Sequence, residues 1–235
     1  MVKHLSSLAI LAVAAGIVTA APAARADAIY SPLTVTVWNG LGTTDTADLG
    51  SMPSPTAALA TFTYTGPLDF ANNVYGSTNT FLQFFNSQGS TNYTSDISNF
   101  SSSDTLSSFL STVMSTPGES KGINTYMSFT GSYTGGGSVS VVHDDGASLY
   151  TGMGYINTVL SSPNPTSAIP TTGTLPTGTN TPFDLIYVES NGAPSDLEVT
   201  GLSPVPEPDS LLLLGTGLLG AAGIARRKLC SKMNS

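Results

Sequence analysis

Residues 123–150 read INTYMSFTGSYTGGGSVSVVHDDGASLY and contain the pattern that decides the fold. Polar and apolar residues alternate over 123–134 and form a second short run over 138–142, as expected of half-buried β-strands. Gly135, Gly136 and Gly137 separate the two runs and predict a turn between them. The stretch closes with His143-Asp144-Asp145-Gly146 and a further apolar run. This order predicts consecutive short strands in a β-rich domain.

Similar runs occur along the rest of the body. Further strands are predicted at residues 29–38, 60–65, 80–85, 183–188 and 196–200.

Two other segments interrupt this pattern. Between residues 101 and 114 the apolar spacing becomes helical, so we expect one short amphipathic helix with Ser103 or Asp104 as its N-cap. Residues 161–182 are rich in proline, threonine and glycine and predict a long loop. Many short strands, turns at glycine and proline, and a single helix indicate a mainly β fold, a single β-sandwich.

The charge of the body is strongly one-sided. Residues 29–203 contain twelve acidic residues against one basic residue, Lys121. Such a surface repels phosphate backbones, which excludes nucleic acid as a partner. It suits divalent cations, although a merely solvated acidic surface is the alternative explanation.

Cysteine and histidine are almost absent. The only cysteine is Cys230, close to the C-terminus, so the body has no disulfide. His143 is the only histidine outside the first few residues. A zinc site built from cysteine and histidine is therefore excluded, and a Ser-His-Asp triad would need His143 as its base.

The N-terminus has the layout of a secretory signal peptide. Lys3 and His4 precede an apolar run at residues 8–21, and small residues follow at the positions that signal peptidase reads. We expect a signal helix within residues 1–28, removed by cleavage after Ala26 or Ala28.

The C-terminus contains three features in order. A proline-rich motif comes first, then an uncharged run at residues 211–225, then a basic stop; the motif is Val205, Pro206, Glu207 and Pro208, and the stop is Arg226, Arg227 and Lys228. As a helix, 15 residues reach roughly 22 Å, less than the ~30 Å hydrocarbon core. The basic end is expected to stay cytoplasmic, and a plain membrane anchor is the alternative reading.

This order resembles the PEP-CTERM sorting tail of Gram-negative bacteria. The resemblance implies transient anchoring of the apolar helix in the inner membrane, cleavage near Pro206 to Pro208 by a membrane-bound exosortase, and release of the body to the cell surface or the extracellular space. The expected organisation is a signal peptide at 1–28, a β-sandwich body at 29–203, the sorting tail at 204–228 and a cytoplasmic end at 229–235.

The segment around Asp144 and Asp145 carries a second resemblance. Residues 141–150, together with the late strand at 183–187, are similar to the protective-antigen-like β-sandwich modules of bacterial adhesins, glycosidases and yeast flocculins. In sugar-binding members of that family, paired aspartates hold a calcium ion that coordinates sugar hydroxyls. Asp144 and Asp145 match that pair, which implies calcium as a cofactor.

Several details of this predicted site stay open at the level of sequence. Gly146 would allow a positive φ, and the remaining calcium ligands would come from loop carbonyls or from side chains such as Asn157 and Asn191. The alternative is a hairpin turn in which Asp144 and Asp145 cap their own backbone.

Two functions fit these sequence features. The first is an exported, non-catalytic surface or extracellular-matrix protein that binds exopolysaccharide with calcium. The second is a secreted polysaccharide hydrolase, for which Glu189, Asp196 and Glu198 offer an acid and a base. A solvated pair of strands explains these three carboxylates more simply, and a polar rim position explains His143.

Overall fold

A computed structural model describes residues 28–41, 46–72, 78–86, 93–117 and 124–204. The predicted β-sandwich is confirmed for this part of the chain. One continuous series of paired strands runs β10 (Asn157–Ser162), β9 (Gly146–Thr151), β11 (Ile169–Glu189), β8 (Thr125–Asp144), β2 (Leu33–Asn39), β3 (Ala60–Tyr64) and β6 (Ile97–Ser102). Further strands attach to it: β12 (Ser195–Thr200), β4 (Asp69–Asn72), β1 (Ala28–Tyr30) and β13 (Leu202–Pro204).

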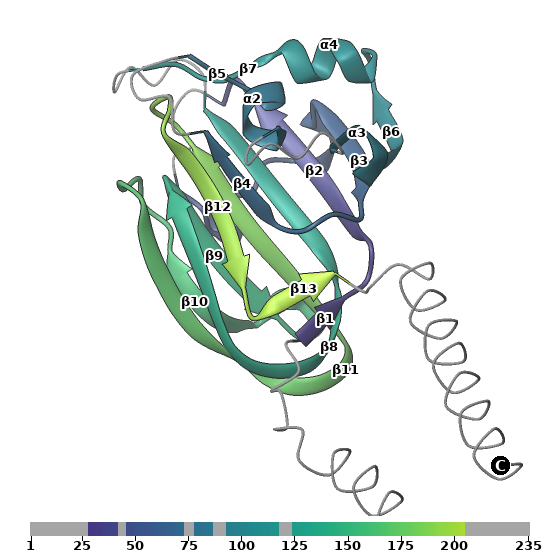
Figure 1. Ribbon diagram of the computed structural model, residues 1–235, viewed down its shortest axis with the longest axis vertical. Helices are drawn as coiled ribbons and strands as arrows, with labels where there is room; N and C mark the ends of the chain where they lie inside the picture. The colour runs from purple at the N-terminus through teal and green to yellow at the C-terminus, as the bar shows by residue number, and fades with distance from the viewer. Residues whose placement is uncertain (1–27, 42–45, 73–77, 87–92, 118–123, 205–235) are drawn as a thin grey trace, which may run out of the picture.

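The two long strands β8 and β11 belong to both layers of the sandwich (Figure 1). The first half of β8 pairs with β2, whereas its second half, from Ser140 to Asp144, pairs with β12. The predicted turn at Gly135 to Gly137 is therefore wrong, since these residues lie within one bent strand. Gly135 and Gly137 have φ values of 111° and 135°, which favour glycine and let the strand change layer without ending.

The core lies between these two layers. Phe70 of β4 stacks on Phe129 from the first half of β8, with ring centroids 6.1 Å apart, which places β4 and β12 opposite β8 and β2. Phe84 stacks on Tyr187 of β11 at 5.4 Å and closes one end of the core. The aromatic rings supply the apolar area that stabilises a body without disulfides.

Helices gather at that end of the sandwich (Figure 1). The predicted helix is α4 (Leu106–Ser111), which starts at the N-cap Thr105, after the two expected caps. Two further short helices, α2 (Phe81–Phe85) and α3 (Tyr93–Asp96), and a small sheet of β5 (Asn79–Thr80) and β7 (Val113–Ser115) accompany it.

Three sequence predictions of local structure are wrong for identifiable reasons. Residues 80–85 were expected to form a strand, but the Thr80 hydroxyl and the Gln83 side chain form a capping box that starts α2 instead. The loop expected at 161–182 is largely strand, because β11 begins at Ile169. The strand expected at 29–38 is divided by Pro32, which has no N–H to donate.

Both ends of the described body lie at the same end of the sandwich. β1 pairs in parallel with β13, joining Ala28 to Leu202, and it also pairs with β8 at Tyr133, beside the bend. Asp144 lies at the far end of β8, roughly 30 Å of strand from Gly135.

The expected signal peptide and sorting tail lie outside the described residues. Within the described ranges, no helix has the length and apolar character needed to cross a membrane.

Candidate functional site: a buried carboxylate pair

Asp144 and Asp145 lie where the chain crosses between non-adjacent strands. β8 ends at Asp144 and β9 begins at Gly146, but the two strands are not paired, because β11 lies between them. The hairpin-turn interpretation is therefore wrong. The peptide bond between the two aspartates is cis.

Asp145 accepts hydrogen bonds on both carboxylate oxygens. Ser190 donates its backbone N–H at 2.8 Å and its hydroxyl at 2.7 Å to Oδ2, and Asn191 donates Nδ2 to Oδ1 at 3.1 Å. Asn191 is thus beside the pair, as the sequence suggested, whereas Asn157 lies opposite Thr151 at the other end of β9. The segment after β11 fixes the orientation of Asp145.

Asp144 is almost fully buried among like charges. Burial is the largest effect that raises the pKa of its carboxyl to about 7, and the charges of Asp145 and Asp196 raise it further. A hydrogen bond from the backbone of Ala168 opposes the rise. Burial also raises the pKa of Asp145. The described residues include no lysine or arginine, so neither aspartate has a basic partner among them.

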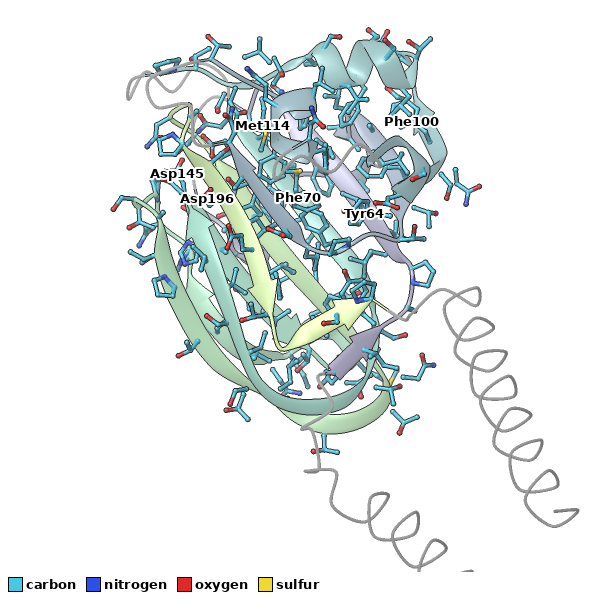
Figure 2. The ribbon with its side chains drawn as sticks, viewed as in Figure 1. Tyr64, Phe70, Phe100, Met114, Asp145 and Asp196 are labelled. Atoms are coloured by element: carbon cyan, nitrogen blue, oxygen red, sulfur yellow. The ribbon has the colours of Figure 1, made fainter. Side chains whose placement is uncertain are left out.

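Asp196 stands opposite Asp144 in the ladder between β12 and β8. Its Oδ1 is buried and has no hydrogen-bond partner, and burial raises the pKa of its carboxyl. Figure 2 shows Asp145 and Asp196 at the same edge of the body. The expectation of a solvated carboxylate at Asp196 is therefore wrong.

His143 is fully buried and does not lie at a polar rim. Its Nδ1 lies 2.6 Å from the carbonyl oxygen of Asp145, and Nε2 lies 2.7 Å from the hydroxyl of Thr171. Because a carbonyl can only accept, Nδ1 carries the proton and Nε2 accepts from Thr171. Burial lowers the pKa of the ring, so His143 is a neutral support for the backbone of Asp145.

Glu189 is also fully buried, which contradicts its expected place on a solvated strand. The Ser115 hydroxyl donates to Oε1 at 2.9 Å, and the Tyr187 hydroxyl lies 2.9 Å from Oε2. Tyr187 also donates to the carbonyl of Asp144. One tyrosine proton cannot serve both acceptors, so a protonated Glu189 donates to Tyr187. Burial is the largest effect that raises the pKa of Glu189 well above its ordinary value, and the charge of Asp145 raises it further.

One of the three carboxylates considered for a hydrolase, Glu189, is out of reach of a substrate. Glu189 has no exposed surface, whereas Glu198 is partly exposed and lies opposite Asp69. A general acid must contact its substrate, which a fully covered Glu189 cannot do in this conformation.

Gly146 is required for close packing rather than for a positive φ. A Cβ at this position would lie 2.3 Å from the carbonyl oxygen of Pro163. The segment after β10 therefore passes directly over the start of β9. The sequence could not reveal this contact, since it joins residues through the tertiary fold.

The chemistry of the pair fits a hard divalent cation. The available donors are carboxylate, amide and carbonyl oxygens, which calcium prefers, and the orphaned Oδ1 of Asp196 adds uncompensated negative charge beside them. Within the described ranges, no group of three or more histidine, cysteine, aspartate or glutamate side chains is placed to hold a metal. A cation here would therefore take Asp144 and Asp145 together with neutral oxygen ligands.

Residues 204–228 match the PEP-CTERM protein-sorting motif. The motif indicates an exported protein whose tail anchors it in the membrane before cleavage, and it implies processing by an exosortase. None of the curated proteins compared with the chain matches it.

The body is similar in fold to several solved structures. It shares 13% identity with a PA14 sugar-binding domain from an RTX adhesin, over 73% of this chain and 88% of that one, at a TM-score of 0.43. The PA14 domain of the MpAFP antifreeze protein gives 15% identity over 72% and 81% of the two chains, at 0.45. A GH31 α-xylosidase from Xanthomonas citri gives 8% identity over 75% of this chain and 15% of the enzyme, at 0.40.

Proposed function

We propose that the chain is an exported, non-catalytic surface or extracellular-matrix protein that binds exopolysaccharide through a calcium ion held by Asp144 and Asp145. The observation that carries this proposal is the pair of buried, adjacent carboxylates without a basic partner among the described residues. Two charges buried in this way are unfavourable unless a cation or protons neutralise them. A bound calcium ion supplies that charge and leaves coordination positions for sugar hydroxyls.

The residues around the aspartate pair hold Asp145 in place. Ser190, Asn191 and His143 hold Asp145 by hydrogen bonds to its side chain or its backbone. The carboxylates are thus oriented before a ligand arrives, which lowers the ordering cost of binding. In the described part of the chain, the buried His143 and Glu189 are both engaged in hydrogen bonds of the fold.

The position of the aspartate pair in the body supports binding by a protein that is anchored through its C-terminal tail. The described body ends at Pro204 next to β1, whereas Asp144 lies at the opposite end of β8. A body held to the membrane through residues 204–228 would present Asp144 and Asp145 away from the lipid. After release, the same surface is available to matrix polysaccharide.

Calorimetric titration of the full chain, in a detergent without sugar headgroups, tests the metal first. We expect binding heat with calcium, weaker heat with magnesium, and loss of the calcium heat in the Asp144→Asn, Asp145→Asn double variant. Asp104→Asn, which removes an exposed charge between β6 and α4, is the matched control and should bind calcium normally.

A panel of glucose, galactose, mannose and fucose, titrated with calcium and then with excess chelator, tests the sugar. Binding of at least one sugar that disappears with chelator supports the proposal. Sugar binding that is indifferent to chelator, or an absence of any calcium heat, would contradict it. Reducing-sugar release from polysaccharide that is lost in Glu198→Gln would instead support a hydrolase.

A further inference from the structure

A hydroxyl-lined groove lies on the outer face of the layer that β12 forms with the second half of β8. It has a volume of about 500 Å³, within the range of ligand-binding pockets. Its side-chain hydroxyls come from β8, β11 and the end of β12: Ser138, Ser140, Thr172, Thr174 and Thr200. Val139 and Gly173 complete the lining, so no charged residue contributes to it.

The strand register explains why these hydroxyls gather. Ser140 of β8 lies opposite Thr172 of β11 on one side and opposite Thr200 of β12 on the other. Ser138 lies opposite Thr174 in the next row. Because side chains alternate between faces, the buried neighbours Val139 and Val141 point into the core while the hydroxyls face solvent.

The five hydroxyls are available to a ligand. None of them makes a side-chain hydrogen bond to another residue in the described part of the chain. Two other serine hydroxyls of the sheet are already occupied: Ser128 donates to Asp184 at 2.7 Å, and Ser132 donates to Asn180 at 2.6 Å. The groove therefore concentrates unused donors and acceptors on one concave surface.

The strands that form the groove lead on to the aspartate pair. Residues 138, 140, 142 and 144 of β8 share one face, and Asp196, Glu198 and Thr200 of β12 run alongside them. From Ser138 to Asp144 the strand extends roughly 20 Å. The buried, unpartnered Oδ1 of Asp196 stands at the end of this row beside Asp144. Along this face, the neutral hydroxyls of the groove lie at one end and the buried carboxylates of Asp144 and Asp196 lie at the other.

We propose that this groove is a second binding site that holds the neighbouring sugar units of a linear, uncharged polysaccharide whose terminal unit occupies the Asp144 and Asp145 site. The inference rests on the proposed function and adds the class of ligand to it. Hydroxyl groups can both donate and accept, so serine and threonine side chains complement a polyhydroxyl chain. The lining has no ionic groups to desolvate. The acidic charge of the body disfavours anionic polymers.

The test compares oligosaccharide length in the full chain with calcium present. Soluble manno- and malto-oligosaccharide ladders, from the monosaccharide upward, are titrated by calorimetry. We expect affinity to rise with length until the groove is filled. Thr172→Val with Thr174→Val, which removes two hydroxyls without changing side-chain volume much, should weaken the longer oligomers by about 5- to 30-fold. It should leave the monosaccharide and calcium unaffected.

The matched control is Thr34→Val with Thr158→Val, which removes two exposed hydroxyls from strands of the other layer. This variant should bind every oligomer as the parent chain does, and thermal unfolding should confirm that both double variants remain folded. Affinity independent of length, or an equal loss in both double variants, overturns the groove while leaving calcium-dependent monosaccharide binding intact. Absence of any calcium-dependent sugar binding overturns the groove and the proposed function together.

Discussion

Asp196 on β12 lies directly opposite Asp144 on β8, and both side chains are almost fully buried. Opposed residues of an antiparallel pair extend from the same face, so the two carboxyls repel each other wherever both are ionised. The charge of Asp196 is one cause of the raised pKa of Asp144. The folded body thus tolerates an unfavourable arrangement at one edge, which is understandable if the edge binds a cation.

Asp196→Asn should therefore stabilise the calcium-free chain. Removing one of the opposed charges lowers the repulsion on Asp144, and we expect the free energy of unfolding at pH 8 to rise by roughly 1 kcal/mol. Urea unfolding in the presence of chelator measures the change. Asp104→Asn, at an exposed site, should have almost no effect. A decrease in stability specific to Asp196→Asn would show that this carboxylate makes a favourable contact in the calcium-free state.

Glu189 should behave as a neutral side chain. Since it is protonated and bonded to Ser115 and Tyr187, the isosteric Glu189→Gln should change the free energy of unfolding by less than about 1 kcal/mol. Glu189→Ala leaves the Ser115 hydroxyl without its acceptor and opens a cavity, so it should cost about 3 kcal/mol. Equilibrium urea unfolding at neutral pH distinguishes the two. A large and equal loss in both variants would indicate an ionised carboxylate that glutamine cannot replace.

The alternation of the sequence predicted most of the sandwich. The strands around Val35 and Phe62 were found because one side of each is buried and the other is polar, so the period of two survives in the sequence. Local chemistry explains two of the failures: the Thr80 and Gln83 capping box converts an apparent strand into α2, and glycines bend β8 instead of ending it. These outcomes depend on which neighbour a side chain meets.

The site was predictable only in part. Two adjacent aspartates at a strand end pointed to Asp144 and Asp145, and the amide of Asn191 was expected near them. Sequence could not show that Asp196 stands opposite Asp144, because that depends on the register between strands far apart in the chain. The burial of His143 and Glu189 was missed for the same reason, since polar residues are ordinarily expected at the surface.

Asp184 should make stability depend on pH away from the aspartate pair. It is fully buried, its Oδ1 accepts from Ser128 at 2.7 Å, and its Oδ2 has no partner. Burial raises its pKa from 3.8 to about 6. The folded state therefore binds a proton that the unfolded state has released, and its stability falls as pH rises from about 4 to about 6, by about 3 kcal/mol in total.

The variant Asp184→Asn tests this pH dependence. The amide keeps the hydrogen bond to Ser128 but cannot ionise, so the fall between pH 4 and pH 6 should be smaller than in the parent chain by about the same amount. Urea unfolding across this range gives the comparison, and Asp104→Asn serves as the exposed control. An unchanged pH profile in Asp184→Asn would show that Asp184 is already ionised at low pH.

The mature N-terminus should be Asp27 rather than Ile29. Ala28 is the first residue of β1, is fully buried, and donates its N–H to the carbonyl of Gly201 at 3.2 Å. Cleavage after Ala28 would remove this residue and place a charged amine beside the bend of β8. Mass spectrometry of the exported protein should therefore give a start at Asp27. A start at Ile29 in the parent chain would contradict the prediction.

The sorting tail gives a prediction about what the released protein lacks. If exosortase cuts near Pro206 to Pro208, the extracellular form loses the basic stop and Cys230, the only thiol in the chain. A maleimide reagent should then label the denatured, membrane-bound precursor but not the denatured, released protein. Glu207→Ala should hold the chain in the membrane fraction with Cys230 intact, whereas Lys232→Ala, beyond the stop, should be released normally. Labelled Cys230 in the parent's extracellular protein would mean that the tail is retained on export.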